Sequence, residues 1–257
     1  MNEAIAALVR RHDPDRFLTA LFAPPDKRDA LLTLYAFNHE LARAREVVSE
    51  PPLALIRLQW WREVVEGMYR RHEVADPLSA AIDAAELDRG DLLRLIDARE
   101  AEVEPAFLTV TDWRNYLFGS AGGVAVAAGR LLGAPDPETL RQLGAAYGIA
   151  GLLRSIPAHS RQGRCLLPAD ILAEHGLTPE GLISEPSAMA VRAVTQRLAH
   201  EGLMLLMERT RLPRRAIAAG LPAVLARRDL RRASALPPQR GITDRLAVTL
   251  AGIAARV

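Results

Sequence analysis

The feature that most limits how this chain can fold is a recurrence of apolar residues at spacings of four and three. It is clearest after Pro25, where the residues on one helix face are Ala30, Leu34, Phe37, Leu41, Ala44 and Val48. Similar stretches cover 53–67, 78–87, 91–103, 111–132, 169–175 and 187–211, with further helices opened by Asp136-Pro137 and at about Thr243. No stretch alternates as a half-buried strand does, so the pattern predicts an all-α fold in a single domain over residues 1–257.

Composition narrows the class of protein. Nearly half of the 257 residues are apolar and a quarter are charged, which indicates a globular domain. A net charge of +2 gives no support for a nucleic-acid partner. Cys165 is the one cysteine, and the longest charge-free run, 115–129, is shorter than the ~18 residues that span a bilayer. We expect a cytoplasmic protein without a signal peptide, and contact with the inner membrane surface stays open.

Residues 144–168 carry the most informative motif. A helix rich in small residues runs into an arginine-rich turn that contains Arg161, Gly163, Arg164 and Leu167-Pro168. Ser155 and His159 are four apart and share a helix face. A hydroxyl and an imidazole are poor ligands for magnesium, which prefers carboxylates and phosphates. No Asp or Glu lies between Thr139 and Ala169, so this stretch does not predict a magnesium site.

Together with segments 34–37, 95–97 and 116–125, this motif resembles the squalene/phytoene synthase family over about residues 15–210. The resemblance implies the isoprenoid synthase fold, a helical bundle around a central cavity. In that family two aspartate pairs hold magnesium against prenyl diphosphates. The resemblance places the first pair at Ala42 and Glu46 and the second at Ser155 and His159, so both motifs are degenerate and no metal site is expected.

Segments 37–42, 49–51 and 57–62 further resemble a degenerate branch of the family that includes mitochondrial complex I assembly factor 6. Members of that branch are regarded as non-catalytic. The favoured interpretation is therefore an assembly or interaction factor without a cofactor, whose partners are complex I subunits or assembly intermediates. Two alternatives stay open. One is a magnesium-dependent prenyltransferase that condenses two prenyl diphosphates, and the other is a protein that binds a prenyl lipid in the old cavity.

Three arginines allow two interpretations. By the family resemblance, Arg154, Arg161 and Arg164 are diphosphate-binding residues, and guanidinium groups can hold phosphate without a metal. The alternative is a solvated loop in an arginine-rich chain. Because Pro157 is expected to bend or end the helix, we expect the three side chains to converge on a cavity mouth that faces Ala42 and Glu46.

Two local features complete the expectations. Gly119, Gly122 and Gly123 indicate either close helix packing or a substrate-sized cavity. Trp60 and Trp61 point about 100° apart on a helix, so we expect one in the core and the other half-exposed. The same helix is expected to bury one side made of Leu53, Ile56, Trp60, Val64 and Gly67.

Overall fold

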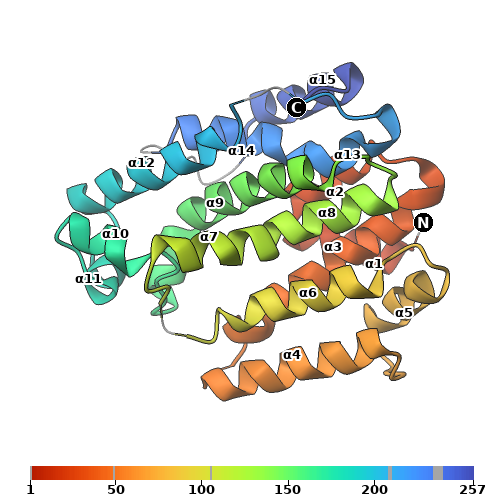
Figure 1. Ribbon diagram of the computed structural model, residues 1–257, viewed down its shortest axis with the longest axis horizontal. Coiled ribbons are helices and arrows are strands. Elements are labelled where there is room, and N and C mark those ends of the chain that lie inside the picture. The colour runs from red at the N-terminus through yellow and green to blue at the C-terminus, as the bar shows by residue number, and fades with distance from the viewer. Residues whose placement is uncertain (1, 49, 105, 208–209, 234–239) are drawn as a thin grey trace.

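A computed structural model describes residues 2–48, 50–104, 106–207, 210–233 and 240–257. Within these ranges the chain forms helices, turns and two isolated bridges, and the buried apolar side chains gather into one core. The all-α prediction is therefore confirmed. In Figure 1, α8 and α9 run through the middle of the molecule, with α4 and α6 on one side and α12, α14 and α15 on the other.

The elements follow one another with short connections. Their bounds are α1 (Glu3–His12), α2 (Pro14–Ala20), α3 (Pro25–Glu46), α4 (Pro51–Glu66), α5 (Ala75–Asp83), α6 (Arg89–Glu100), α7 (Val110–Gly119), α8 (Ala121–Leu131), α9 (Pro137–Arg161), α10 (Ala169–Glu174), α11 (Pro179–Ser184), α12 (Met189–Met204), the 3₁₀ helix η1 (Arg214–Ala216), α13 (Ile217–Gly220), α14 (Pro222–Arg231) and α15 (Ile242–Ala254). No helix among the described residues is long and apolar enough to cross a membrane.

Helix α9 begins where its sequence predicts and ends later. Asp136 accepts hydrogen bonds from the backbone N–H groups of Glu138 and Thr139, at 3.0 and 3.2 Å, and Pro137 occupies the first turn. We expected the helix to bend or end at Pro157. It does not end there, because it continues to Arg161. A proline removes one intrahelical hydrogen bond, and α9 stays helical because it buries side chains on both sides of that position.

Two other predicted ranges need correction. Residues 111–132 form two helices rather than one, because the chain turns at Ser120, whose hydroxyl donates to the Tyr116 carbonyl at 2.6 Å. The predicted helix 187–211 is shorter, since α12 ends at Met204 and residues 208–209 lie outside the described part. The arginine-dense stretch after Pro213 contains α14, which the sequence did not predict.

Helix α4 is turned relative to its predicted orientation. Its buried side chains are Ala54, Leu58, Trp61, Val64 and Val65, whereas Leu53 and Ile56 are 42% and 65% exposed. The reason is that the largest side chain, Trp61, packs into the core edge-on against Phe37, with ring centroids 5.4 Å apart. Trp60 stays partly exposed, so the prediction of one inward and one outward tryptophan is confirmed.

Glycines bring α8 and α9 into close contact. A Cβ atom at Gly144 would lie 2.5 Å from the Ala121 carbonyl oxygen and 2.7 Å from the Ala125 Cβ. A Cβ atom at Gly122 would lie 2.8 Å from the Arg141 carbonyl oxygen. Of the two interpretations given to the predicted glycines, close packing therefore holds at Gly122. This contact fixes the position of α9, which carries Arg154, Ser155 and His159.

We expect Gly144→Ala to lower the free energy of unfolding by about 1–3 kcal/mol, because its new methyl group would overlap a backbone carbonyl that cannot move away. The matched control is Gly151→Ala in the same helix. Nothing lies within 4 Å of a Cβ there, so this change should raise stability by about 0.5–1 kcal/mol. Urea denaturation measures both values, and equal effects of the two variants would contradict the close contact.

Candidate functional site

A cavity of about 290 Å³, the central cavity, lies among α3, α6, α8 and α9. Ala42 and Glu46 reach it from α3, and Ser155 and His159 reach it from α9. The structure thus brings together all four positions that the sequence singled out. The remaining lining residues are His12, Asp13, Arg16, Asn38, His39, Arg99, Glu102, Tyr116, Leu117, Ser120, Ala121, Tyr147, Gly148, Gly151, Leu152, Arg164 and Leu166.

The three singled-out arginines do not converge. Arg164 lines the central cavity, Arg154 lines a neighbouring cleft, and Arg161 is exposed. The cause is the unbroken course of α9, in which Arg154 points about 100° from Ser155 and about 140° from His159. The expectation of one shared cavity mouth is wrong, and anion binding by these residues stays a prediction.

Buried Glu102 neutralises the arginines in the central cavity. Its carboxylate accepts a hydrogen bond from the Tyr116 hydroxyl at 2.6 Å, pairs directly with Arg99 and lies 3.4 Å from the Arg164 guanidinium. Arg99 also donates to the Asn38 side-chain oxygen at 3.1 Å. Two guanidinium groups are thereby held by carboxylate and amide oxygens of the protein, which leaves little free positive charge for a ligand.

Burial sets the protonation of the other cavity groups. It raises the pKa of Glu46, and the positive charge of Arg164 offsets this only in part. Burial, reinforced by Arg164, lowers the pKa of His159 to about 4, so this imidazole is neutral at pH 7. For Glu102 burial alone would raise the pKa, but Arg99, the Tyr116 hydroxyl and Arg164 together lower it. Of the two glutamates in the cavity, only Glu102 has a lowered pKa, and its carboxylate is already paired with arginines.

This set of side chains does not fit a magnesium ion. Ala42 offers no ligand atom, Ser155 offers a neutral oxygen, and His159 offers nitrogen, which suits softer metals. Glu46 is the one carboxylate among the four positions, and its raised pKa opposes the ionised form that a metal needs. Within the described residues no three His, Cys, Asp or Glu side chains come together in a way that could hold a metal ion.

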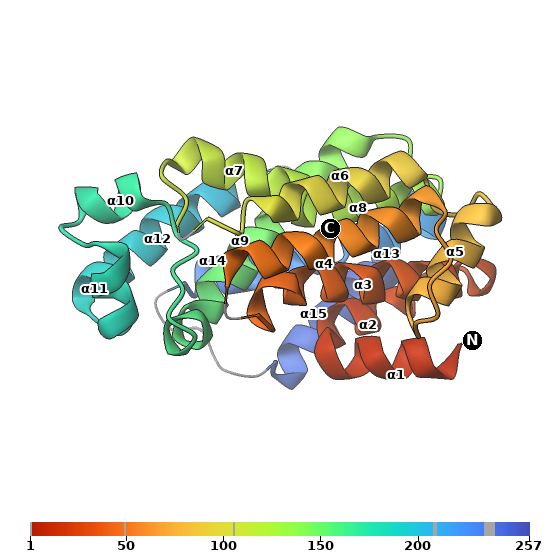
Figure 2. The ribbon, with the colours of Figure 1, turned by 90° about the horizontal axis from the view of Figure 1, so that it is seen from below.

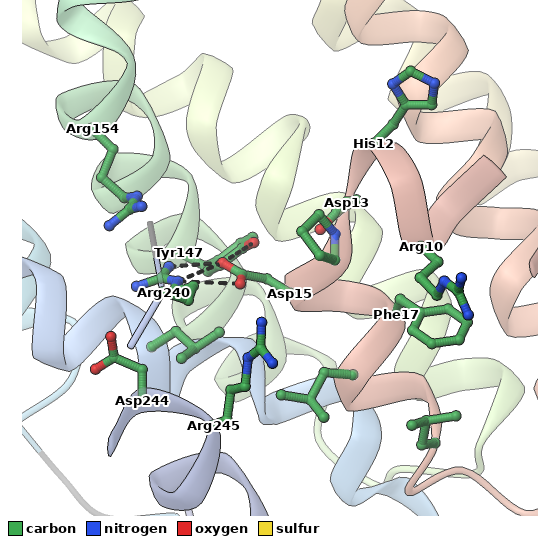
Figure 3. A pocket seen from close by; sticks show the side chains of 14 residues that line it. Arg10, His12, Asp13, Asp15, Phe17, Tyr147, Arg154, Arg240, Asp244 and Arg245 are labelled. Atoms are coloured by element: carbon green, nitrogen blue, oxygen red, sulfur yellow. Dashed lines mark hydrogen bonds and ion pairs between the residues drawn. The ribbon is translucent and has the colours of Figure 1, made fainter. Parts of the chain in front are cut away.

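A second cavity, the outer cleft, has a volume of about 820 Å³ and shares His12, Asp13 and Tyr147 with the central cavity. Figure 3 shows Arg240 facing Asp15 across it. Arg240 donates to Asp15 at 2.7 and 2.9 Å and to fully buried Asp229 at 2.6 Å. The Asp229 carboxylate also pairs with Arg154 at 3.4 Å, which explains where Arg154 points.

Sequence reasoning missed this second network. Asp15 and Arg240 are 225 positions apart, and Asp229 lies in the unpredicted helix α14. No local pattern marks such a pair, because each charge looks like an ordinary surface residue until the helices pack. Asp13-Pro14, next to Asp15, indicated only a chain break.

Comparison with known proteins identifies a family and several similar sequences. The family model described as Squalene/phytoene synthase matches residues 9–251. The chain is 30% identical over 226 residues to NADH dehydrogenase (ubiquinone) complex I, assembly factor 6, of Mus musculus, covering 85% of this chain and 68% of that protein. It is 28% identical over 203 residues to phytoene synthase of Pseudescherichia vulneris, covering 71% of this chain and 64% of that protein.

A solved structure shares the fold. The crystal structure of a dehydrosqualene synthase in complex with ligand superposes with a TM-score of 0.77 at 14% sequence identity, covering 98% of this chain and 95% of that chain. At this identity the likeness bears on the fold alone. The predicted bundle of the isoprenoid synthase type is confirmed.

We expect the stability of the protein to fall by about 2 kcal/mol between pH 7 and pH 5 through His159. Its pKa is about 4 in the folded chain against about 6.5 when unfolded, so below pH 6.5 the unfolded chain takes up a proton that the folded chain does not. His159→Gln should remove this part of the pH dependence, whereas Ser155→Ala should keep it. Urea denaturation at both pH values measures the difference. The same loss in His159→Gln as in the unchanged protein would contradict the assignment.

Proposed function

The chain belongs to the squalene/phytoene synthase family, and we propose that it is a non-catalytic member that acts as an assembly or interaction factor for respiratory complex I. The observation that carries the proposal is the set of side chains at Ala42, Glu46, Ser155 and His159, which meet in the central cavity and do not suit magnesium. In our interpretation these residues occupy the places of the two aspartate pairs of the catalytic relatives.

The chemistry of prenyl transfer supports this proposal. Joining two prenyl diphosphates requires diphosphate to leave, and its developing negative charge must be neutralised. In this cavity the nearest cations, Arg99 and Arg164, are already paired with buried Glu102. A diphosphate would have to displace that carboxylate and leave it buried without a partner, which costs several kcal/mol.

The lining of the central cavity also suits a prenyl chain poorly. Fourteen of its 21 residues are polar or charged, among them Glu102, Arg99 and Tyr116 at the centre of the network. An apolar chain placed there would remove solvent from these groups without forming hydrogen bonds to them. The lining of the cavity therefore suits a structural role in holding the helices together better than the binding of a prenyl substrate.

Relatives supply the direction of the function. Several proteins named complex I assembly factor 6 are 28–30% identical to this chain, and phytoene synthases are related as well. Because the cavity does not suit the synthase reaction, we infer the role of this chain from the assembly factors rather than from the phytoene synthases. The proposed partners are complex I subunits or assembly intermediates. The alternative function is that of a prenyltransferase, which the similarity to phytoene synthases supports.

We expect deletion of this gene in its host to lower NADH:ubiquinone oxidoreductase activity and the amount of assembled complex I. Because the cavity residues are proposed to have no catalytic role, a copy that carries Glu46→Ala with Ser155→Ala should restore both as well as the unchanged copy does. Native gel electrophoresis and membrane NADH oxidation provide the measurements.

In parallel, purified protein is incubated with farnesyl or geranylgeranyl diphosphate and magnesium, and no squalene- or phytoene-type product is expected. Product formation that Glu46→Ala abolishes would establish the prenyltransferase alternative. Normal complex I in the deletion strain would contradict the assembly role even if no product forms.

A further inference from the structure

Helix α15 presents a row of large aliphatic side chains to the outside. Ile242, Leu246, Leu250 and Ile253 are 77%, 54%, 67% and 62% exposed, and their spacing of four, four and three places them on one face over the length of the helix. Its opposite side holds buried Asp244 and Val248 and packs against α14, with a further contact to α2. Figures 1 and 2 show α15 at the edge of the molecule. A row this long is more than the scattered apolar exposure of an ordinary surface.

The basic residues of the chain are concentrated in its C-terminal segment, which includes α15. Residues 210–257 contain ten arginines and two acidic residues, a net charge of +8 against +2 for the whole chain, so residues 1–209 carry a net charge of −6. Both acids of this segment, Asp229 and Asp244, are buried, at 0% and 1% exposure, and paired with arginines. The C-terminal segment that carries the aliphatic row is therefore strongly basic.

Two arginines of the outer cleft bear on this surface, and one of them lies on α15 itself. Arg245 of α15 and Arg10 of α1 line the outer cleft, and Figure 3 shows both among its side chains. Neither forms an ion pair with another described residue. Phe17 and Leu18 of α2, with Leu21 directly after it, line the same cleft and continue the apolar surface inward. On α15, aliphatic groups that can enter a lipid layer thus adjoin the guanidinium group of Arg245, which can bind a headgroup.

From this arrangement we propose that the outer face of α15, together with the mouth of the outer cleft, docks on a lipid bilayer that contains anionic phospholipids. The aliphatic row would enter the upper acyl region, while Arg245 and Arg10 would bind headgroup phosphates. A second copy of the chain is disfavoured as the occupant, because two such faces would bring positive charge against positive charge. The row also lacks the aromatic residues and methionine that are enriched where proteins bind one another.

The test is co-sedimentation of the full chain with lipid vesicles. We expect binding to vesicles of phosphatidylcholine with 30% phosphatidylglycerol, weakening as salt rises, and at least about tenfold weaker binding to phosphatidylcholine alone. Leu246→Asn with Leu250→Asn should weaken binding to the anionic vesicles by about tenfold or more. Arg245→Gln should weaken it less and reduce its dependence on salt.

The matched control is Leu53→Asn with Ile56→Asn on α4, which removes two aliphatic side chains of similar exposure from another face. This variant should bind the anionic vesicles as the unchanged chain does, and thermal unfolding checks that both double variants stay folded. Equal loss in both double variants, or equal binding to neutral and anionic vesicles, would overturn the proposal. So would a stable dimer in solution that Leu246→Asn with Leu250→Asn converts to a monomer, since the row would then bind a second copy.

Discussion

The close contact of α8 with α9 is the constraint on which the rest of the structure depends. Gly144 lets the two backbones approach until a single added methyl group would overlap a carbonyl oxygen. Helix α9 also packs against α7, α12 and α14, so its position is transmitted to both halves of the bundle. The same helix carries Ser155 and His159 into the central cavity and Arg154 into the outer cleft. The contact between these two backbones thus sets where the side chains of α9 enter both cavities.

Buried ion pairs stand in the interior of this bundle. Glu102 holds Arg99 and Arg164, and on the other side of α9 Arg240 joins Asp15 to Asp229. Such pairs add little net stability compared with apolar packing, but removing one partner leaves an uncompensated charge and is costly. Each network links helices far apart in the chain, so the pairs specify one arrangement of helices.

How far the sequence predicts this structure depends on the range of the interactions involved. The start of α9 at Pro137 follows from its cap and its proline, which act within a few residues, and it is confirmed. The inward face of α4 was wrong, because only tertiary packing selects Trp61 over Trp60 for the core. The four positions that the family resemblance singled out line one cavity. The resemblance did not reveal the pairing of Glu102 with Arg164, of Asp229 with Arg154 or of Arg240 with Asp15, because pairing across 60 to 225 positions leaves no local pattern.

The distribution of arginine separates the interior of the protein from its surface. Nearly every basic residue is arginine, so their number alone says nothing about function. Their partners do. Arg99, Arg164 and Arg240 form ion pairs with carboxylates inside the fold, and these pairs connect helices. In the last 48 residues ten arginines face only two acids, both of them buried, so the arginines of this segment outnumber its carboxylates. Among the arginines of the outer cleft, Arg154 and Arg240 are paired with Asp229, whereas Arg245 of α15 and Arg10 of α1 form no ion pair with a described residue and stay available to a partner outside the fold.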